Sequence, residues 1–204
     1  MTAVLAVPLG STEQHGPHLP PSTDTDIAVA LTRALAQERP NVEPAPAIPY
    51  GSSGEHAGFP NTLSIGQDAL ERVLVELVRS TDLPVLIVNA HGGNACPLAR
   101  AVALLQREGR RVASWSPAYD GDLHAGFSET SLMLAIAPDA VDMRRAEKGD
   151  TRPWAEIGET IRRSGVAAVS PNGVLGDPTG ASREAGVALF EELVASLVAA
   201  ADAL

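Results

Sequence analysis

Cysteine and aromatic residues are scarce in this chain of 204 residues. Cys96 is the only cysteine, so the chain contains no internal disulfide and cannot form a cysteine-based zinc site on its own. Aromatic residues account for 3% of the sequence, so a core has to be built from Ala, Val, Leu and Ile. Such a core suits helices packed closely on a sheet, and we expect Cys96 to be one of its small buried residues.

Positive charge and long apolar runs are also in short supply. Lys and Arg number 15 against 25 Asp and Glu, and the formal net charge of −10 argues against nucleic-acid binding. The apolar run at residues 4–9 follows no basic segment and is too short for a signal peptide or a membrane span. We therefore expect a soluble cytoplasmic protein with no nucleic-acid partner and no membrane partner.

Short β-rich runs alternate with longer helical patterns in a composition typical of globular proteins, with 45% hydrophobic and 20% charged residues. The order β-α-β-α-β predicts an α/β fold with a mostly parallel sheet and helices on both faces. A chain of this length buries most of its apolar surface around one core, so we expect residues 1–204 to form a single domain. Strands are expected at residues 4–9, 85–88, 111–115 and 166–170, with an edge or irregular strand at 42–50, and helices at 26–37, 68–80, 96–108, 129–136, 154–163 and 182–203.

All five histidines lie in glycine-rich or acid-rich segments rather than in helical stripes. Two of these segments, residues 10–16 and 89–94, directly follow expected strands, which is where parallel α/β sheets bind their ligands. Imidazole and carboxylate groups without a thiolate suit Zn²⁺, Mn²⁺ or Fe²⁺. The sequence therefore predicts a metal site at this edge of the sheet.

Glu13 and His15 are the first candidate ligands. Two residues apart on extended backbone, their side chains point to the same side and could bind one ion or two adjacent ions. Asp24 either returns to the same place or, like Thr23, caps the following helix. His18 has an alternative interpretation as an exposed side chain.

His91 directly follows the most hydrophobic strand, which holds it in place, and precedes two glycines that allow close backbone approach to a ligand. The alternative is a turn with an incidental histidine. Asn94 is expected to cap the next helix.

His124 and Glu129 form a third group, with Asp122 ahead of them. Asp122 could hold the His124 ring in one tautomer, which is the support that a general acid or base requires. Glu129 could instead merely complement the dipole of a helix that starts nearby. The spacing alone leaves both interpretations open.

At these residues the sequence resembles the creatininase family of metal-dependent amidohydrolases. The resemblance runs in family order from residue 4 to beyond residue 180, so it covers nearly the whole chain. The similar segments are residues 8–16, 23–24, 54–56, 59–64, 89–94, 124–126, 129–131 and 173–178.

This resemblance implies a three-layer α/β/α sandwich with a mostly parallel central sheet. It also implies a centre of two divalent metal ions, Zn, Fe or Mn, with Asp24 as the bridge between them. The implied catalytic residues are His124, as the proton-transfer group, and Glu129. The implied metal ligands are Glu13, His15, Asp24, His91 and Glu129.

Within the family, the sequence is most similar to peptidases that remove a C-terminal Val-Tyr dipeptide from a modified ribosomal precursor peptide. The resemblance thus implies hydrolysis of an amide bond by a metal-activated water, in a homo-oligomer such as a hexamer or octamer. The alternatives are a hydrolase of a small cyclic or formyl amide and a non-catalytic, metal-binding partner in a biosynthetic complex.

One segment departs from the family pattern. Creatininase carries His-Tyr-Glu-Asn where this chain has residues 91–94, His-Gly-Gly-Asn, so an aromatic substrate contact and a carboxylate ligand are missing. Creatinine is therefore not the expected substrate. For the terminal carboxylate of a peptide, the candidates are Arg144, Arg145 and Lys148, although a solvated basic turn is the favoured interpretation of these residues.

Overall fold

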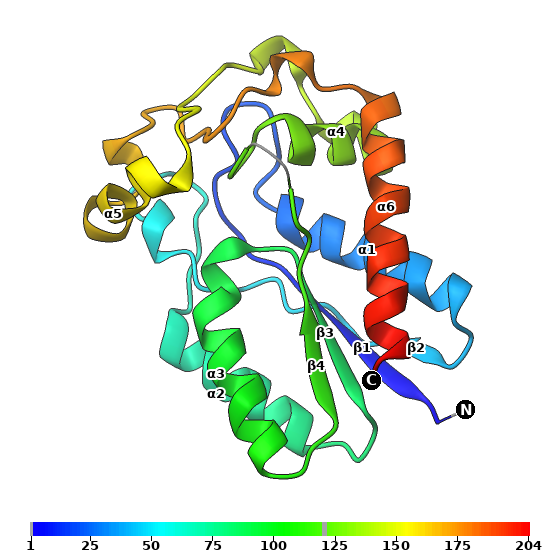
Figure 1. The fold of residues 1–204 in the computed structure, drawn as a ribbon. Helices are drawn as coiled ribbons and strands as arrows, with labels where there is room; N and C mark the ends of the chain where they lie inside the picture. The colour runs from blue at the N-terminus through cyan, green and yellow to red at the C-terminus, as the bar shows by residue number, and fades with distance from the viewer. Residues whose placement is uncertain (1, 120–121) are drawn as a thin grey trace.

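A four-stranded parallel sheet forms the centre of the computed structural model, which describes residues 2–119 and 122–204 (Figure 1). Its strands are β1 (Val4–Leu9), β2 (Val42–Pro44), β3 (Val85–Asn89) and β4 (Val112–Trp115), in the spatial order β2-β1-β3-β4. The helices are α1 (Thr23–Glu38), α2 (Gln67–Arg79), α3 (Ala95–Arg107), α4 (Phe127–Ile136), α5 (Trp154–Ser164) and α6 (Arg183–Asp202).

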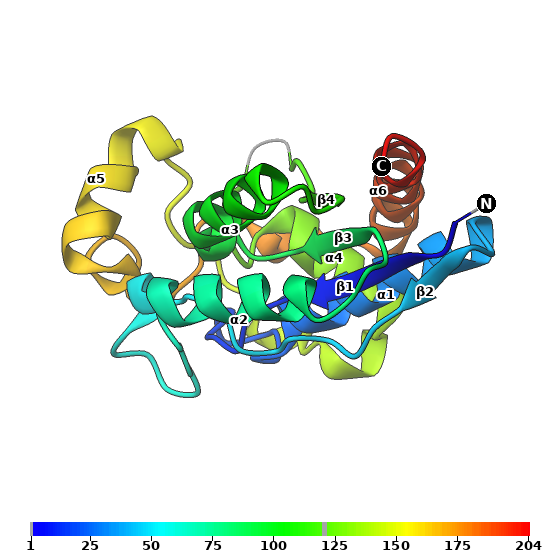
Figure 2. The ribbon, with the colours of Figure 1, turned by 90° about the horizontal axis from the view of Figure 1, so that it is seen from below.

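Helices cover both faces of the sheet, which confirms the predicted three-layer α/β/α sandwich. Helices α1, α4 and α6 lie on one face and α2 and α3 on the other (Figure 2). Their apolar side chains form a separate core cluster on each face. The central strand β3 serves both layers, because Leu86 and Val88 face the first and Val85 and Ile87 face the second. Each such side chain contributes about 1.5–3 kcal/mol when fully buried, so this apolar strand anchors the sandwich.

The strand expected at residues 42–50 is shorter than predicted, and the one expected at 166–170 does not form. Strand β2 ends at Pro44, because proline lacks the N–H that a ladder needs, and residues beyond it bond to β1 only irregularly. The strand expected at residues 166–170 is wrong, since Val166–Ala168 is a turn of 3-10 helix. This turn follows Gly165, which has a φ of 79°. The Gly165 carbonyl accepts a hydrogen bond from the Ala168 backbone N, so the chain turns here instead of extending.

Helix α1 begins at Thr23, three residues earlier than expected, and this shift determines where Asp24 lies. Ser22 occupies the position before the helix, so neither Thr23 nor Asp24 is the capping residue. Asp24 lies in the first helical turn with its side chain buried. No helix among residues 2–119 and 122–204 has the length and apolar character needed to cross a bilayer.

Candidate metal centre

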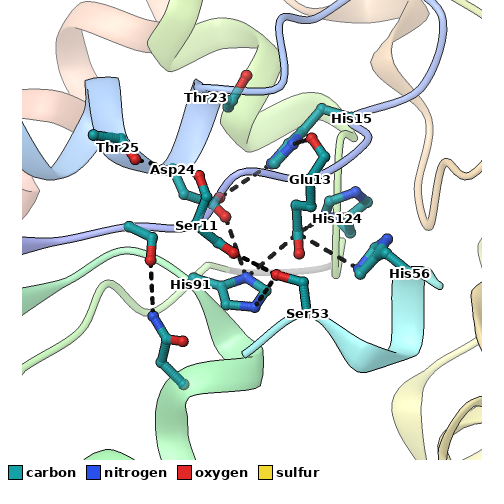
Figure 3. Close-up of polar contacts among 12 residues, drawn as sticks. Ser11, Glu13, His15, Thr23, Asp24, Thr25, Ser53, His56, His91 and His124 are labelled. Atoms are coloured by element: carbon teal, nitrogen blue, oxygen red, sulfur yellow. Dashed lines mark hydrogen bonds and ion pairs between the residues drawn. The ribbon is translucent and has the colours of Figure 1, made fainter. Parts of the chain in front are cut away.

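Five acidic and histidine side chains converge where β1 and β3 end. Figure 3 shows four of them, Glu13, His15, Asp24 and His91. Strands β1 and β3 are neighbours, with Leu9 opposite Asn89, so the segments that follow them emerge side by side. The first turns of α1 and α4 approach the same place and complete the group. Its members, all at most 6% exposed, are Glu13, His15, Asp24, His91 and Glu129.

Asp24 lies between two sets of ligand atoms. On one side, His91 Nδ1 is 3.2 Å from Asp24 Oδ2 and 3.3 Å from Glu13 Oε1. On the other side, His15 Nε2 is 3.0 Å from Asp24 Oδ1 and 3.9 Å from Glu129 Oε2. One carboxylate thus presents an oxygen to each set, which is the arrangement needed to bridge two adjacent ions.

Several carboxylate oxygens of this group have no hydrogen-bond donor. Glu13 Oε1, Glu13 Oε2 and Asp24 Oδ2 are buried, and no described residue donates a hydrogen bond to any of them. Burying a carboxylate without compensation costs several kcal/mol, and a bound cation removes that cost. Imidazole and carboxylate donors are those preferred by Zn²⁺, Mn²⁺ and Fe²⁺, so the residues fit a divalent metal.

Backbone carbonyls orient three of the histidine rings from outside the centre. In each ring the outer nitrogen bonds to a carbonyl oxygen, which leaves the inner nitrogen to face the carboxylates. Metal-binding histidines in general are held in this way. The three bonds run from His15 Nδ1 to Glu13 O at 3.1 Å, from His91 Nε2 to Ser52 O at 3.0 Å and from His124 Nε2 to Gln14 O at 2.8 Å.

Burial and mutual attraction shift the pKa values of the cluster in opposite directions. Burial lowers the pKa of His15, but the Asp24 and Glu129 carboxylates outweigh it and raise that pKa to about 10. Burial raises the pKa of Glu129 to about 7, against the attraction of His15. For Glu13, burial raises the pKa, but the surrounding imidazoles, led by His91, together outweigh burial and hold this pKa well below its usual range. The protein without metal therefore stores protons on groups that a metal needs deprotonated.

His124 lies beside this group, but its ring is not held by Asp122, which was one of the interpretations that the spacing left open. The Asp122 carboxylate accepts hydrogen bonds from the Ser128 backbone N at 3.0 Å and the Ser128 hydroxyl at 2.8 Å, so it caps α4. The ring of His124 is held by Gln14 instead, and its Nδ1 lies 3.5 Å from Glu13 Oε1. Burial lowers the pKa of His124 well below the usual range, so the ring is neutral.

The structure also rules out the alternative interpretation of His18, finds no cap bond from Asn94 and contradicts the burial expected for Cys96. His18 is buried, not exposed, and its Nε2 lies 2.8 Å from the Thr130 hydroxyl. Asn94 makes no cap bond, because its amide bridges the Gly10 carbonyl and the Ser52 amide of two separate loops. Cys96 is exposed instead of buried, because it lies on the side of α3 that faces a cavity.

This cavity of about 980 Å³ opens from the carboxylate and histidine group toward α5. Its wall includes the half-exposed Trp154, and the described arginines that line it are Arg162 and Arg163. The basic residues considered as candidates for a substrate carboxylate do not line this cavity. Arg144 is exposed and bonded to Asp142, Arg145 is exposed, and Lys148 lies 3.6 Å from Asp177, which is the solvated basic turn of the alternative interpretation.

Glu55 and His56 also belong to the site, although neither is among the predicted ligands. Both belong to the 3-10 turn Gly54–His56, and His56 Nε2 lies 3.5 Å from Glu13 Oε1. The Glu55 carboxylate lies over Gly93, where a Cβ atom would be 2.2 Å from Glu55 Oε1. A carboxylate is therefore present beside His91 even though residue 93 supplies none. The sequence feature that indicates these two residues is an adjacent Glu-His pair in a glycine-rich segment.

Comparison with known proteins identifies the family of this chain. The profile described as "Creatininase: Creatinine amidohydrolase" matches residues 1–201. The chain belongs to the creatininase family. It is 48% identical to the mycofactocin precursor peptide peptidase of Mycolicibacterium smegmatis over 95% of this chain and 82% of that protein. It is 28% identical to the creatinine amidohydrolase of Pseudomonas putida over 94% of this chain and 85% of that protein.

Solved creatininases share the fold of this family member. One crystal structure of creatinine amidohydrolase superposes with a TM-score of 0.83 at 26% identity, covering 97% of this chain and 88% of that chain. A structure described as "Creatininase Mn" has a TM-score of 0.76 at 27% identity, covering 97% and 89%. A mutant creatininase of "Zn-Zn type" has a TM-score of 0.81 at 26% identity, covering 97% and 89%. The chain is thus a hydrolase of C–N bonds, in a family whose members carry Zn or Mn.

The crowding at Gly93 leads to a stability prediction. Gly93→Ala should lower the free energy of unfolding by about 1–3 kcal/mol, because its Cβ would lie 2.3 Å from the Ser52 carbonyl oxygen. Gly92→Ala is the matched control, since a Cβ there meets no atom within 4 Å. Urea titrations of the two variants measure the difference, and equal stabilities would contradict the close packing around Gly93.

The raised pKa of His15 leads to a prediction about pH. Its contribution to the stability of the metal-free protein is complete below pH 6.5 and disappears as the pH rises through about 10. The melting temperature of the metal-free protein should therefore fall between pH 7 and pH 10. Binding of Zn²⁺ at pH 7.5 should release protons, because His15 gives up its proton to become a ligand.

Calorimetric titration in buffers of different ionisation enthalpy measures this release. His15→Asn, which cannot hold that proton, should flatten the pH dependence of the melting temperature in the metal-free protein. A binding enthalpy independent of the buffer would show that the imidazoles are already unprotonated and would overturn the assignment of a stored proton to His15.

Proposed function

We propose that this protein is a metal-dependent peptidase that releases the C-terminal Val-Tyr dipeptide from a modified ribosomal precursor peptide. The observation that carries the proposal is the shared Asp24 carboxylate between two sets of ligand atoms at the end of a large cavity. The peptide substrate is supported by the 48% identity to a relative named for cleaving the mycofactocin precursor peptide.

Two divalent ions, Zn, Mn or Fe, would bind on either side of Asp24. Glu13 and His91 complete the first ligand set, and His15 and Glu129 complete the second. The unsatisfied oxygens of Glu13 and Asp24 support this assignment, as do the Zn and Mn creatininases. Such a pair of ions supplies Lewis acidity, which polarises the scissile carbonyl and acidifies the attacking water.

His124 would carry the proton from the attacking water to the leaving amine. Its neutral ring can accept a proton on Nδ1, which faces Glu13, while Nε2 stays bonded to the Gln14 carbonyl. Glu129 is the second proposed catalytic residue, because as a member of the second ligand set it would help to hold an ion that activates the water. Its Oε2 also accepts a hydrogen bond from the Ala125 backbone N at 2.6 Å, which fixes the carboxylate.

The cavity is suited to the end of a peptide chain. Its volume of about 980 Å³ exceeds what a creatinine-sized molecule needs, and its wall combines apolar and cationic groups. Trp154 offers an aromatic surface to an aromatic side chain, with the Arg162 guanidinium 5.5 Å from the centre of its ring. Arg162 and Arg163 are the proposed partners of the terminal carboxylate.

We further infer that residues 1–204 act as one domain in a cytoplasmic homo-oligomer of six or eight copies. The family profile supports the single domain, since it extends over residues 1–201 without interruption. The oligomer is supported by the creatininase resemblance, and sedimentation measures its size directly.

Peptide cleavage tests this function. The metal-loaded protein should remove Val-Tyr from the modified precursor peptide, as seen by mass spectrometry, and should leave creatinine intact. Chelation of the metal should abolish cleavage. Bound metal with an intact peptide would refute the peptidase assignment, and hydrolysis of creatinine would favour the alternative of a small cyclic amide.

The same assay tests His124. His124→Ala should reduce kcat about 100-fold or more while metal content stays unchanged, because a proton-transfer group is lost without loss of a ligand. His18→Gln is the control for removing a buried imidazole, since His18 bonds to Thr130 and does not face the carboxylates. Unchanged turnover in His124→Ala would remove His124 from the mechanism, and a loss of metal would make it a ligand instead.

A further inference from the structure

The side-chain amide of Gln14 has an orientation that two backbone groups determine. Its Oε1 accepts a hydrogen bond from the Gly16 backbone N at 2.9 Å, and its Nε2 donates to the Gly173 carbonyl at 3.0 Å. A backbone N–H can only donate and a carbonyl can only accept, so the two ends of the amide cannot be exchanged. Gly173 is suited to this contact, since a Cβ there would lie 1.9 Å from Gln14 Oε1 and its φ is 80°.

The second proton of the same amide identifies the tautomer of His56. Gln14 Nε2 lies 2.8 Å from His56 Nδ1, and both are buried. Because Gln14 Nε2 can only donate, His56 Nδ1 has to accept, and the neutral ring then carries its proton on Nε2. That N–H faces the centre, where Glu13 Oε1 lies 3.5 Å away without a hydrogen bond. The His56 Nε2–H is therefore free to donate a hydrogen bond to an oxygen atom of a molecule bound in the cavity that His56 lines.

The backbone carbonyl of Gln14 fixes the opposite tautomer in His124. His124 Nε2 lies 2.8 Å from the Gln14 carbonyl oxygen, which can only accept, so this nitrogen carries the proton. The Gln14 side-chain Nε2 also lies 3.2 Å from it, but the two protons of that amide go to the closer Gly173 carbonyl and His56 Nδ1. The lone pair of His124 is then on its Nδ1, which faces Glu13 Oε1 at 3.5 Å. Figure 3 shows His56 and His124 both directed toward Glu13, so the two rings present opposite hydrogen-bonding groups to one place.

We propose that Gln14 is a positioning residue that fixes opposite tautomers in His56 and His124, so that His56 donates a hydrogen bond to the substrate and His124 accepts the proton. His56 Nε2–H would donate to the oxygen of the scissile amide, where negative charge develops during attack by water. His15, His91 and His124 all bond outward to carbonyl oxygens, whereas His56 bonds outward to a donor. This contrast assigns His56 as a hydrogen-bond donor rather than as a metal ligand with Glu13 and Glu55, whose ligand atoms lie within 4.8 Å of its own. This inference rests on the proposed function.

Imidazole ¹⁵N NMR of the Zn²⁺-loaded protein tests the tautomers without any substrate. The His56 signals, assigned by difference from His56→Gln, should show a protonated Nε2 and an unprotonated Nδ1. In Gln14→Glu the new carboxylate accepts from Nδ1, so the two signals should exchange. A wild-type His56 that is protonated on Nδ1, or on both nitrogens, would overturn the proposal whether or not the peptide is cleaved.

Turnover of the precursor peptide then tests the donor role. His56→Leu should lower kcat about 100-fold or more, the usual effect of removing one such donor, with KM and metal content little changed. His56→Gln carries an amide N–H near the position of the imidazole Nε2 and should recover at least tenfold of that loss. A His56→Leu variant that loses metal, or a His56→Gln variant no better than His56→Leu, would contradict the donor role. Wild-type protein that fails to cleave the peptide would instead overturn the proposed function.

Discussion

The unpaired carboxylate oxygens of Glu13 and Asp24 impose the strongest constraint on this structure. They are buried among imidazoles, and no donor in the described residues satisfies them. In a setting of low polarity such charges persist only because partners of opposite charge lie within a few ångströms. A divalent cation is the partner that lowers their energy most, so these unpaired carboxylates favour the binding of a metal ion.

The parallel sheet is what keeps these groups together. Since β1 and β3 are hydrogen-bonded neighbours in register, the residues that follow Leu9 and Asn89 begin at the same edge. The apolar layers on both faces hold the strands, and the backbone carbonyls near this edge hold the histidine rings. Fold and function are therefore linked through the backbone. A change that moves the carbonyl of Ser52 or of Gln14 would rotate the ring of His91 or of His124 without replacing any metal ligand.

The fold and the main ligand candidates could be predicted because they depend on local patterns. Glu13 and His91 lie in the segments that follow two apolar strands, so their place near this edge of the sheet is expected from the topology. His56 and Asn94 could not be placed, because their roles depend on how a short 3-10 turn packs against distant loops. The same holds for Asp122, whose nearest donors belong to α4 and not to the histidine two residues along. Pro44 and Gly165 limited the strand predictions through backbone geometry that apolar patterns do not encode.

The most direct test of the central claim is anomalous diffraction from crystals of the metal-loaded protein, recorded at the absorption edge of the metal. We expect two peaks, one bounded by Glu13, Asp24 and His91 and one bounded by His15, Asp24 and Glu129. Asp24 should contact both ions, and the His56 ring should contact neither. Metal bound elsewhere in the chain, with no peak among these five side chains, would contradict a two-metal centre bridged by Asp24.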